Sequence, residues 1–163
     1  MKFDLSGRVA LVTGASSGLE AHFARVLAGA GAHVAIHARR PDRLERLATE
    51  LIGAGGRVFP AELDVQDPGQ AASVVERGSR ELGGIDVLVN NAGVTLSKAA
   101  MDYSEADFDA VLDVNLRGAF TLAQETARTM GWKGGSIINI GSTIRLRQSG
   151  QVAAYAISKA GVI

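Results

Sequence analysis

The stretch RVALVTGASSGLE, from Arg8 to Glu20, decides the fold of this chain. Its first part, Arg8 to Thr13, is a short apolar run, and helical spacing of apolar residues follows from Ser17 to Ala30. The turn between them has the spacing G-x-x-x-G. Glycines at such a turn let the backbone approach a diphosphate, and the helix N-terminus offers unpaired N–H groups to the anion. A tight strand-to-helix turn without a ligand explains the same glycines, so both interpretations stay open here.

The alternation of strand and helix continues through the rest of the chain. Strands are expected over 8–13, 33–38, 57–63, 85–90 and 136–140. Helices are expected over 17–30, from 41 to the glycines that begin at 53, and over 68–82, 105–130 and 152–163. The strand runs are continuously apolar, which is typical of parallel strands covered by helices on both faces. We therefore expect an α/β fold, a doubly wound parallel sheet in three layers (α/β/α), as one domain over residues 1–163.

The composition excludes several classes of protein. The formal net charge of zero gives no basic field to attract nucleic acid or an anionic membrane. Cysteine is absent, which excludes disulfides and cysteine-bound metal, and His22, His33 and His37 lack the spacing of a metal site. The start of the chain at Met1 has no apolar signal region, and no apolar run is long enough to span a membrane. We expect a cytoplasmic protein without a metal.

A second small turn, Asn90-Asn91-Ala92-Gly93, follows the fourth expected strand. In open α/β sheets, ligands bind outside the carboxyl ends of the strands, where the strand order reverses. The first turn and this one both border that point. Small and polar residues there suit a flat ligand that lies against the backbone.

Tyr155 and Lys159 are four residues apart on an expected helix, so they lie on the same helix face. An ordinary tyrosine has a pKa of about 10, and a nearby positive charge favours the phenolate form. Such a tyrosine exchanges protons with an alcohol near neutral pH. Ser142 follows the fifth expected strand, where its hydroxyl can hydrogen-bond a substrate oxygen. The alternative for Tyr155 and Lys159 alone is an ordinary surface pair.

The chain contains, in this order, T-G-x-x-x-G from Thr13, N-N-A-G from Asn90, Asn115, Ser142 and Y-x-x-x-K from Tyr155. With these motifs in this order, it resembles the short-chain dehydrogenase/reductase family. The resemblance runs from Leu5 to Ile163. It implies a Rossmann-type fold and an oxidoreductase that moves a hydride between a nicotinamide cofactor and a carbonyl or secondary alcohol.

The resemblance also implies residue roles. Tyr155 would be the general acid/base, Lys159 would bind the nicotinamide ribose, and Ser142 would bind the substrate oxygen. Asn115 lies on an apolar helix face and would hold a water of the proton relay; the alternative is a core asparagine bonded to nearby backbone. The implied cofactor contacts are Gly14, Ser16, Ser17, Gly18, Leu19, Arg39, Asp64, Val65, Asn91, Ala92, Gly93, Tyr155 and Lys159.

The second expected strand ends in His37-Ala38-Arg39-Arg40. A carboxylate that would bond the ribose 2′-OH of NAD is missing at this position. A guanidinium matches the geometry and charge of a phosphate, so we predict NADP(H) as the cofactor rather than NAD. The alternative is that Arg39, Arg43 and Arg46 form a solvated helix face.

The chain departs from the family pattern in two ways. Glu20 stands where the family has a third glycine, and its charge near a diphosphate is expected to weaken cofactor binding. Family members are also longer, so we expect an incomplete domain without the last strands and the substrate-covering segment. Strand 136–140 would then have an open apolar edge, and the chain alone would be poorly soluble or poorly active. The second functional class is accordingly a non-catalytic nucleotide-binding remnant.

The expected helix over 105–130 is apolar around a wide arc. Leu116, Phe120, Ala123 and Ala127 add a flank beside the face formed by Phe108 and Leu112. Either the helix is simply well buried, or the excess is a subunit contact of a homodimer or homotetramer.

Overall fold

A five-stranded parallel sheet organises the chain, in the order β3-β2-β1-β4-β5. The computed structural model describes residues 3–145 and 150–163; Met1 and Lys2, with which the sequence starts, lie outside the described residues. The strands are β1 (Val9–Thr13), β2 (His33–Ala38), β3 (Val58–Glu62), β4 (Val87–Asn90) and β5 (Ser136–Asn139). The expectation of a doubly wound parallel sheet is confirmed.

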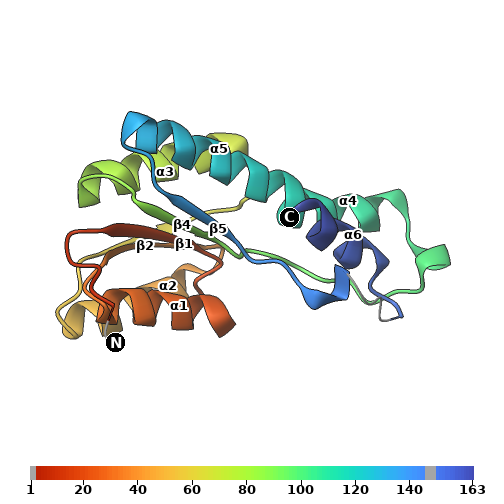
Figure 1. Cartoon of the computed structure of the whole chain (residues 1–163). Helices are drawn as coiled ribbons and strands as arrows, with labels where there is room; N and C mark the ends of the chain where they lie inside the picture. The colour runs from red at the N-terminus through yellow and green to blue at the C-terminus, as the bar shows by residue number, and fades with distance from the viewer. Residues whose placement is uncertain (1–2, 146–149) are drawn as a thin grey trace.

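Helices cover both faces of the sheet, as Figure 1 shows, with α1 and α2 on one side and α3 and α5 on the other. The α-helices are α1 (Gly18–Gly29), α2 (Pro41–Gly53), α3 (Pro68–Leu82), α4 (Glu105–Leu112), α5 (Ala119–Met130) and α6 (Ala153–Gly161). Short 3₁₀ turns are η1 (Ala100–Asp102), η3 (Gly131–Lys133) and η4 (Thr143–Arg145). Two apolar cores result. One contains Leu11, Leu88 and Leu122, and the other contains Val12, Ile36 and Leu47.

A π-helical segment, η2 (Asp113–Gly118), joins α4 to α5. The sequence predicts one uninterrupted helix over 105–130, because apolar periodicity does not reveal one extra residue in a turn. Gly118 lies in this segment, and a Cβ atom there would lie 2.7 Å from the carbonyl oxygen of Val65. The close approach requires glycine and brings the segment against the end of β3. Since π segments occur often at functional sites, Asn115 within it becomes a site candidate on structural grounds.

The strand order reverses between the neighbouring strands β1 and β4, because the chain proceeds to β2 and β3 on one side of them and to β5 on the other. The carboxyl ends of β1 and β4 therefore border the crevice where ligands bind in open α/β sheets. Both glycine-containing turns follow these two strands, as the sequence predicts. The fold thus places the two turns at one site.

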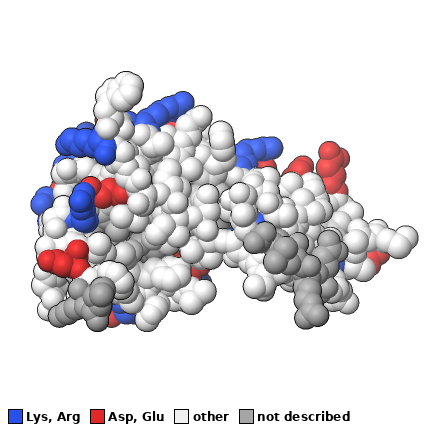
Figure 2. Space-filling model, viewed as in Figure 1, with Lys and Arg blue, Asp and Glu red and all other residues white. Residues whose placement is uncertain are grey.

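β5 is an edge strand in the described part of the chain, where it pairs with β4. The side chains of Ile137 and Ile138 are 39% and 46% exposed. Figure 2 shows that the described face with β5 carries few charged groups near its centre. No helix in the described residues is both long and apolar enough to cross a membrane.

Candidate functional site

A cavity of about 430 Å³ lies at the carboxyl ends of the strands. Its walls come from four strand-to-helix connections and from Val114 of η2. The lining residues are Gly14, Ser16, Ser17, Glu20, His37, Ala38, Arg39, Arg40, Leu63, Asp64, Val65, Ala92, Gly93, Val94 and Val114. Segments far apart in the sequence therefore build one site.

The glycines of the first turn have positive φ angles, +79° at Gly14 and +66° at Gly18. Side chains rarely adopt this backbone conformation. A Cβ atom on Gly14 would also lie 3.2 Å from the Cα atom of Ala92, in the turn after β4. The two turns approach each other so closely that glycine is needed at position 14 for both reasons.

Thr13, the last residue of β1, ties these two turns together. Its buried Oγ1 atom accepts hydrogen bonds from the backbone N–H groups of Asn91 and Ala92, both at 3.1 Å. These N–H groups would otherwise be unpaired inside the protein. The sequence motif contains Thr13 but does not reveal a role for it. In the structure, Thr13 positions the turn after β4.

Arg40 lies across the glycine-rich turn. Its guanidinium donates to the Oγ atom of Ser16 at 2.7 and 3.1 Å and to the Oγ atom of Ser17 at 2.8 Å. Arg39 lines the same cavity. Two guanidinium groups thus stand at the end of β2, and no carboxylate does. The prediction named Arg39 alone, although the adjacent Arg40 was a visible signal.

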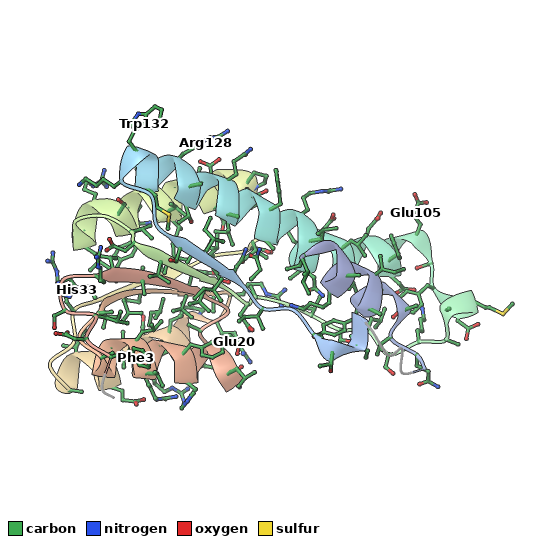
Figure 3. The ribbon with its side chains drawn as sticks, viewed as in Figure 1. Phe3, Glu20, His33, Glu105, Arg128 and Trp132 are labelled. Atoms are coloured by element: carbon green, nitrogen blue, oxygen red, sulfur yellow. The ribbon has the colours of Figure 1, made fainter. Side chains whose placement is uncertain are left out.

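Glu20 lies in the first turn of α1, at the end of the helix that carries its label in Figure 3. Its Oε1 atom accepts a hydrogen bond from the side-chain amide of Asn91. The side chain also lines the cavity. The residue that replaces a third glycine is therefore directed at the site rather than toward solvent.

Asn115 is 1% exposed and bonds the backbone of Val94 in both directions. Its Oδ1 atom accepts from the Val94 N–H at 2.7 Å, and its Nδ2 atom donates to the Val94 carbonyl at 2.9 Å. Nδ2 also donates to the Oγ atom of Ser158 on α6 at 3.0 Å. The structure contains the contacts of the core-asparagine alternative, and it adds a link to the helix that carries Tyr155.

Lys159 is 5% exposed, and its Nζ atom donates to the carbonyl oxygen of Ile140 at 2.7 Å. Nζ lies 5.8 Å from the centre of the Tyr155 ring. Burial lowers the pKa of the Lys159 ammonium, and the negative charge of Glu20 opposes this shift. The positive charge therefore stays close to the phenol and within the electrostatic reach of Glu20.

Ser142 lies between β5 and η4, partly buried, and its Oγ atom accepts from the backbone N–H of Ile144 at 3.3 Å. Among the hydrogen bonds of residues 3–145 and 150–163, none joins Ser142 to Tyr155. The two residues come from neighbouring elements, because α6 packs against η4.

Most of the expected cofactor contacts lie together. Gly18, Tyr155 and Lys159 are not part of the cavity wall, and neither is Leu19, which is exposed on α1. Asn91 is outside the wall too, and acts through its contacts with Thr13 and Glu20. Sequence reasoning missed His37, Ala38, Arg40, Leu63, Val94 and Val114 as lining residues. For the last two, only the approach of η2 to the turn after β4 reveals them.

The residues fit a nucleotide on one side of the cavity. Gly14, with its positive φ angle, brings bare backbone to the cavity wall, a helix begins beside it, and two arginines stand at the end of β2. This is a doubly wound α/β protein with a candidate nucleotide site at its topological switch point.

The sequence pattern of the family described as short chain dehydrogenase matches residues 8–163, and the chain belongs to this family. It is 43% identical over 162 residues to nodulation protein G of Rhizobium sp. strain N33, covering 99% of this chain and 65% of that protein. It is 39% identical over 160 residues to a 3-oxoacyl-[acyl-carrier-protein] reductase of Thermotoga maritima, covering 98% and 65% of the two chains.

Solved structures agree with this assignment. A putative short-chain alcohol dehydrogenase from Sinorhizobium meliloti 1021 superposes with a TM-score of 0.95 at 40% identity, covering 99% of this chain and 65% of that one. A short chain dehydrogenase from Burkholderia cenocepacia J2315 in complex with NADP has a TM-score of 0.91 at 36% identity, covering 97% and 65%. The chain thus spans about 65% of the length of these relatives. Three of these relatives have names that include dehydrogenase or reductase.

Proposed function

We propose that this chain carries the cofactor-binding and proton-transfer part of an oxidoreductase that acts on a carbonyl or a secondary alcohol with NADP(H). The reaction is proposed from the arrangement on α6, where the buried Lys159 ammonium lies 5.8 Å from the Tyr155 ring centre. Family membership supports it. NADP(H), when bound, supplies or accepts the hydride.

Tyr155 is proposed as the general acid/base, which passes a proton to or from the substrate oxygen. Lys159 supplies a positive charge beside it. One of its three N–H donors is used by Ile140, which leaves the others for the ribose hydroxyl groups. Ser142 is proposed to donate its O–H to the substrate oxygen, since its Oγ atom only accepts in the contact with the Ile144 N–H.

Asn115 is proposed to support the proton relay by positioning α6 through Ser158. Both of its amide protons already have protein partners. A relay water near Asn115 therefore bonds either to the second lone pair of Oδ1 or to nearby backbone.

The preference for NADP(H) is proposed from Arg39 and Arg40. A 2′-phosphate at the end of β2 would meet two guanidinium groups, and Arg40 is already oriented by Ser16 and Ser17. Charge-assisted, planar contacts of this kind favour a phosphate over a hydroxyl. The solved relative with NADP is consistent with the same choice.

The cofactor proposal is tested with adenosine 2′-monophosphate (2′-AMP) and adenosine 5′-monophosphate (5′-AMP). The 2′-phosphate compound should bind more tightly, and Arg40→Ala should weaken it by about tenfold or more, the size of a lost charged hydrogen bond. Arg43→Ala, an exposed arginine on α2 outside the cavity wall, is the matched control. Equal affinities for the two monophosphates would contradict the preference.

The reaction is tested by following NADPH absorbance with a panel of ketones, aldehydes and sugar alcohols. Turnover that disappears in Tyr155→Phe supports the proposal. Nucleotide binding without turnover on any substrate would favour the non-catalytic remnant instead.

We further infer that the 105–130 region contributes to a homodimer or homotetramer. Phe120 on α5 is 66% exposed, and Ala127 on the same helix is also exposed. The cytoplasmic location expected from the sequence stays a prediction.

A further inference from the structure

The Glu20 carboxylate is held between the two turns of the cofactor site. On one side, Oε1 accepts from the Asn91 side chain in the turn after β4. On the other side, Cγ lies 3.3 Å from the Cβ position of Gly14, and Oε2 lies 3.0 Å from that of Gly18. The side chain therefore fills the space that the glycines of the first turn leave open.

This position is favourable for an anion. Glu20 is in the first turn of α1, where the unpaired N–H groups and the helix dipole favour negative charge. Its charge also acts on Lys159, where it opposes the effect of burial on the lysine pKa. The carboxylate thus has the surroundings that a helix N-terminus in this fold offers to a phosphate.

The cavity also carries positive charge, and Asp64 adds a second carboxylate to its wall after β3. Arg39 and Arg40 line it at the end of β2, and Arg40 is bonded to the serine hydroxyls of the first turn. One site therefore combines two guanidinium groups at the end of β2 with a carboxylate that already lies at the glycine-rich turn.

We propose that Glu20 is a specificity-determining residue whose negative charge divides the nucleotide site, leaving the adenosine 2′-phosphate side accessible and disfavouring ligands with phosphate at the glycine-rich turn. This inference rests on the proposed function, since it assumes that the cavity accepts an adenine nucleotide. It predicts a protein that binds the half-nucleotide normally and the complete dinucleotide weakly.

The test compares three ligands that differ at the glycine-rich turn. 2′-AMP has no group for that position, adenosine 2′,5′-bisphosphate has one phosphate, and NADP⁺ has a diphosphate. Affinities are measured by NMR chemical-shift titration of the full chain, which follows weak and tight ligands alike. The proteins are wild type, Glu20→Gln, Glu20→Gly and Glu81→Gln. Glu81 is an exposed carboxylate near the end of α3, beside the amino-terminal ends of the strands and away from the cavity, so it controls for net charge.

Glu20→Gln should bind NADP⁺ at least about fivefold more tightly, the effect of removing a like charge ~4 Å away even in a water-like medium. The bisphosphate should gain by a smaller factor. The affinity for 2′-AMP should change least, because this ligand places no phosphate at the glycine-rich turn. Glu81→Gln should behave as wild type with all three ligands.

Two results would overturn the inference while leaving the proposed function intact. One is 2′-AMP binding with no gain for NADP⁺ in either Glu20 variant. The other is a gain confined to Glu20→Gly, which would assign the effect to side-chain volume rather than charge. If 2′-AMP binds to none of the four proteins, the proposed nucleotide site itself is wrong. Thermal unfolding of each variant confirms that the comparison is made on folded protein.

Discussion

The Nζ atom of Lys159 donates a hydrogen bond to the backbone carbonyl of Ile140, at 2.7 Å. This bond connects α6 to the residue that follows β5, so the ammonium is anchored to the sheet. Burial around it lowers the lysine pKa below the usual 10.5. The lysine is therefore both a structural link and a charged group held under a desolvation penalty.

Lys159→Met should change how stability depends on pH. Because the folded-state pKa lies below the unfolded-state value of 10.5, the unfolded chain holds the proton more tightly. Lys159 thus contributes least to stability at neutral pH, and its contribution rises as the pH increases through the folded-state pKa toward 10.5. Urea unfolding at several pH values from 7 to 10 should show wild type gaining stability relative to Lys159→Met. A constant difference would contradict the burial effect.

Thr13→Val should destabilise the protein by about 2 kcal/mol, since two backbone N–H groups lose a buried acceptor. These belong to Asn91 and Ala92. Thr13→Ser keeps the acceptor and should lose only about 1 kcal/mol, the contribution of a buried methyl group. Chemical denaturation measures both. A Val variant as stable as wild type would show that Thr13 contributes through packing alone.

His37 should make stability sensitive to mild acid. Burial lowers its pKa to about 4, and its Nε2 atom lacks a partner among the described residues. The neutral ring is favoured in the folded state, so its contribution is complete above the unfolded-state value of 6.5 and declines as the pH falls toward 4.

Relative to His37→Leu, wild type should lose about 3 kcal/mol between pH 7 and pH 4. Urea unfolding of both proteins measures this loss, and the titration of the other histidines cancels in the comparison. An unchanged difference between pH 7 and pH 4 would show that the ring is protonated in the folded protein without penalty.

The edge of β5 should promote aggregation. Ile137 and Ile138 are partly exposed on a strand that pairs on one side only in the described residues. Ile138→Lys should lower light scattering during incubation, because charge on an edge strand opposes pairing with another chain. Ile52→Lys adds the same charge at an exposed isoleucine on α2 and serves as the control. Equal protection by both variants would mean that net charge matters and the edge does not.

Phe120→Glu should dissociate a homo-oligomer if the exposed side of α5 is a subunit contact. The phenyl ring is 66% exposed in the single chain, and a charge buried at an interface is costly. Sedimentation velocity should show a smaller species than wild type. An unchanged sedimentation coefficient would place any subunit contact elsewhere.

Much of the fold could be predicted because apolar runs and glycine turns are local signals. The predictions for β2 and α3 match the observed bounds, since Pro68 and Gly83 mark the ends of α3. The break of the 105–130 helix at η2 was missed, because a π segment depends on how closely Gly118 approaches Val65. The sequence predicted that strand 136–140 has an open apolar edge. The side chains of β5 are exposed in the structure, which agrees with this prediction.

By itself, the sequence determined the class of fold, the two turns at the switch point and the residues proposed for proton transfer, because spacing along a helix or strand is a local property. Only the tertiary structure decided how these residues meet. It placed Arg40 on Ser16 and Ser17, joined Asn115 to Ser158, and turned the Glu20 carboxylate toward Asn91. Each of these contacts joins residues that are far apart in the sequence. The distance between such residues depends on how the whole sheet and its helices pack.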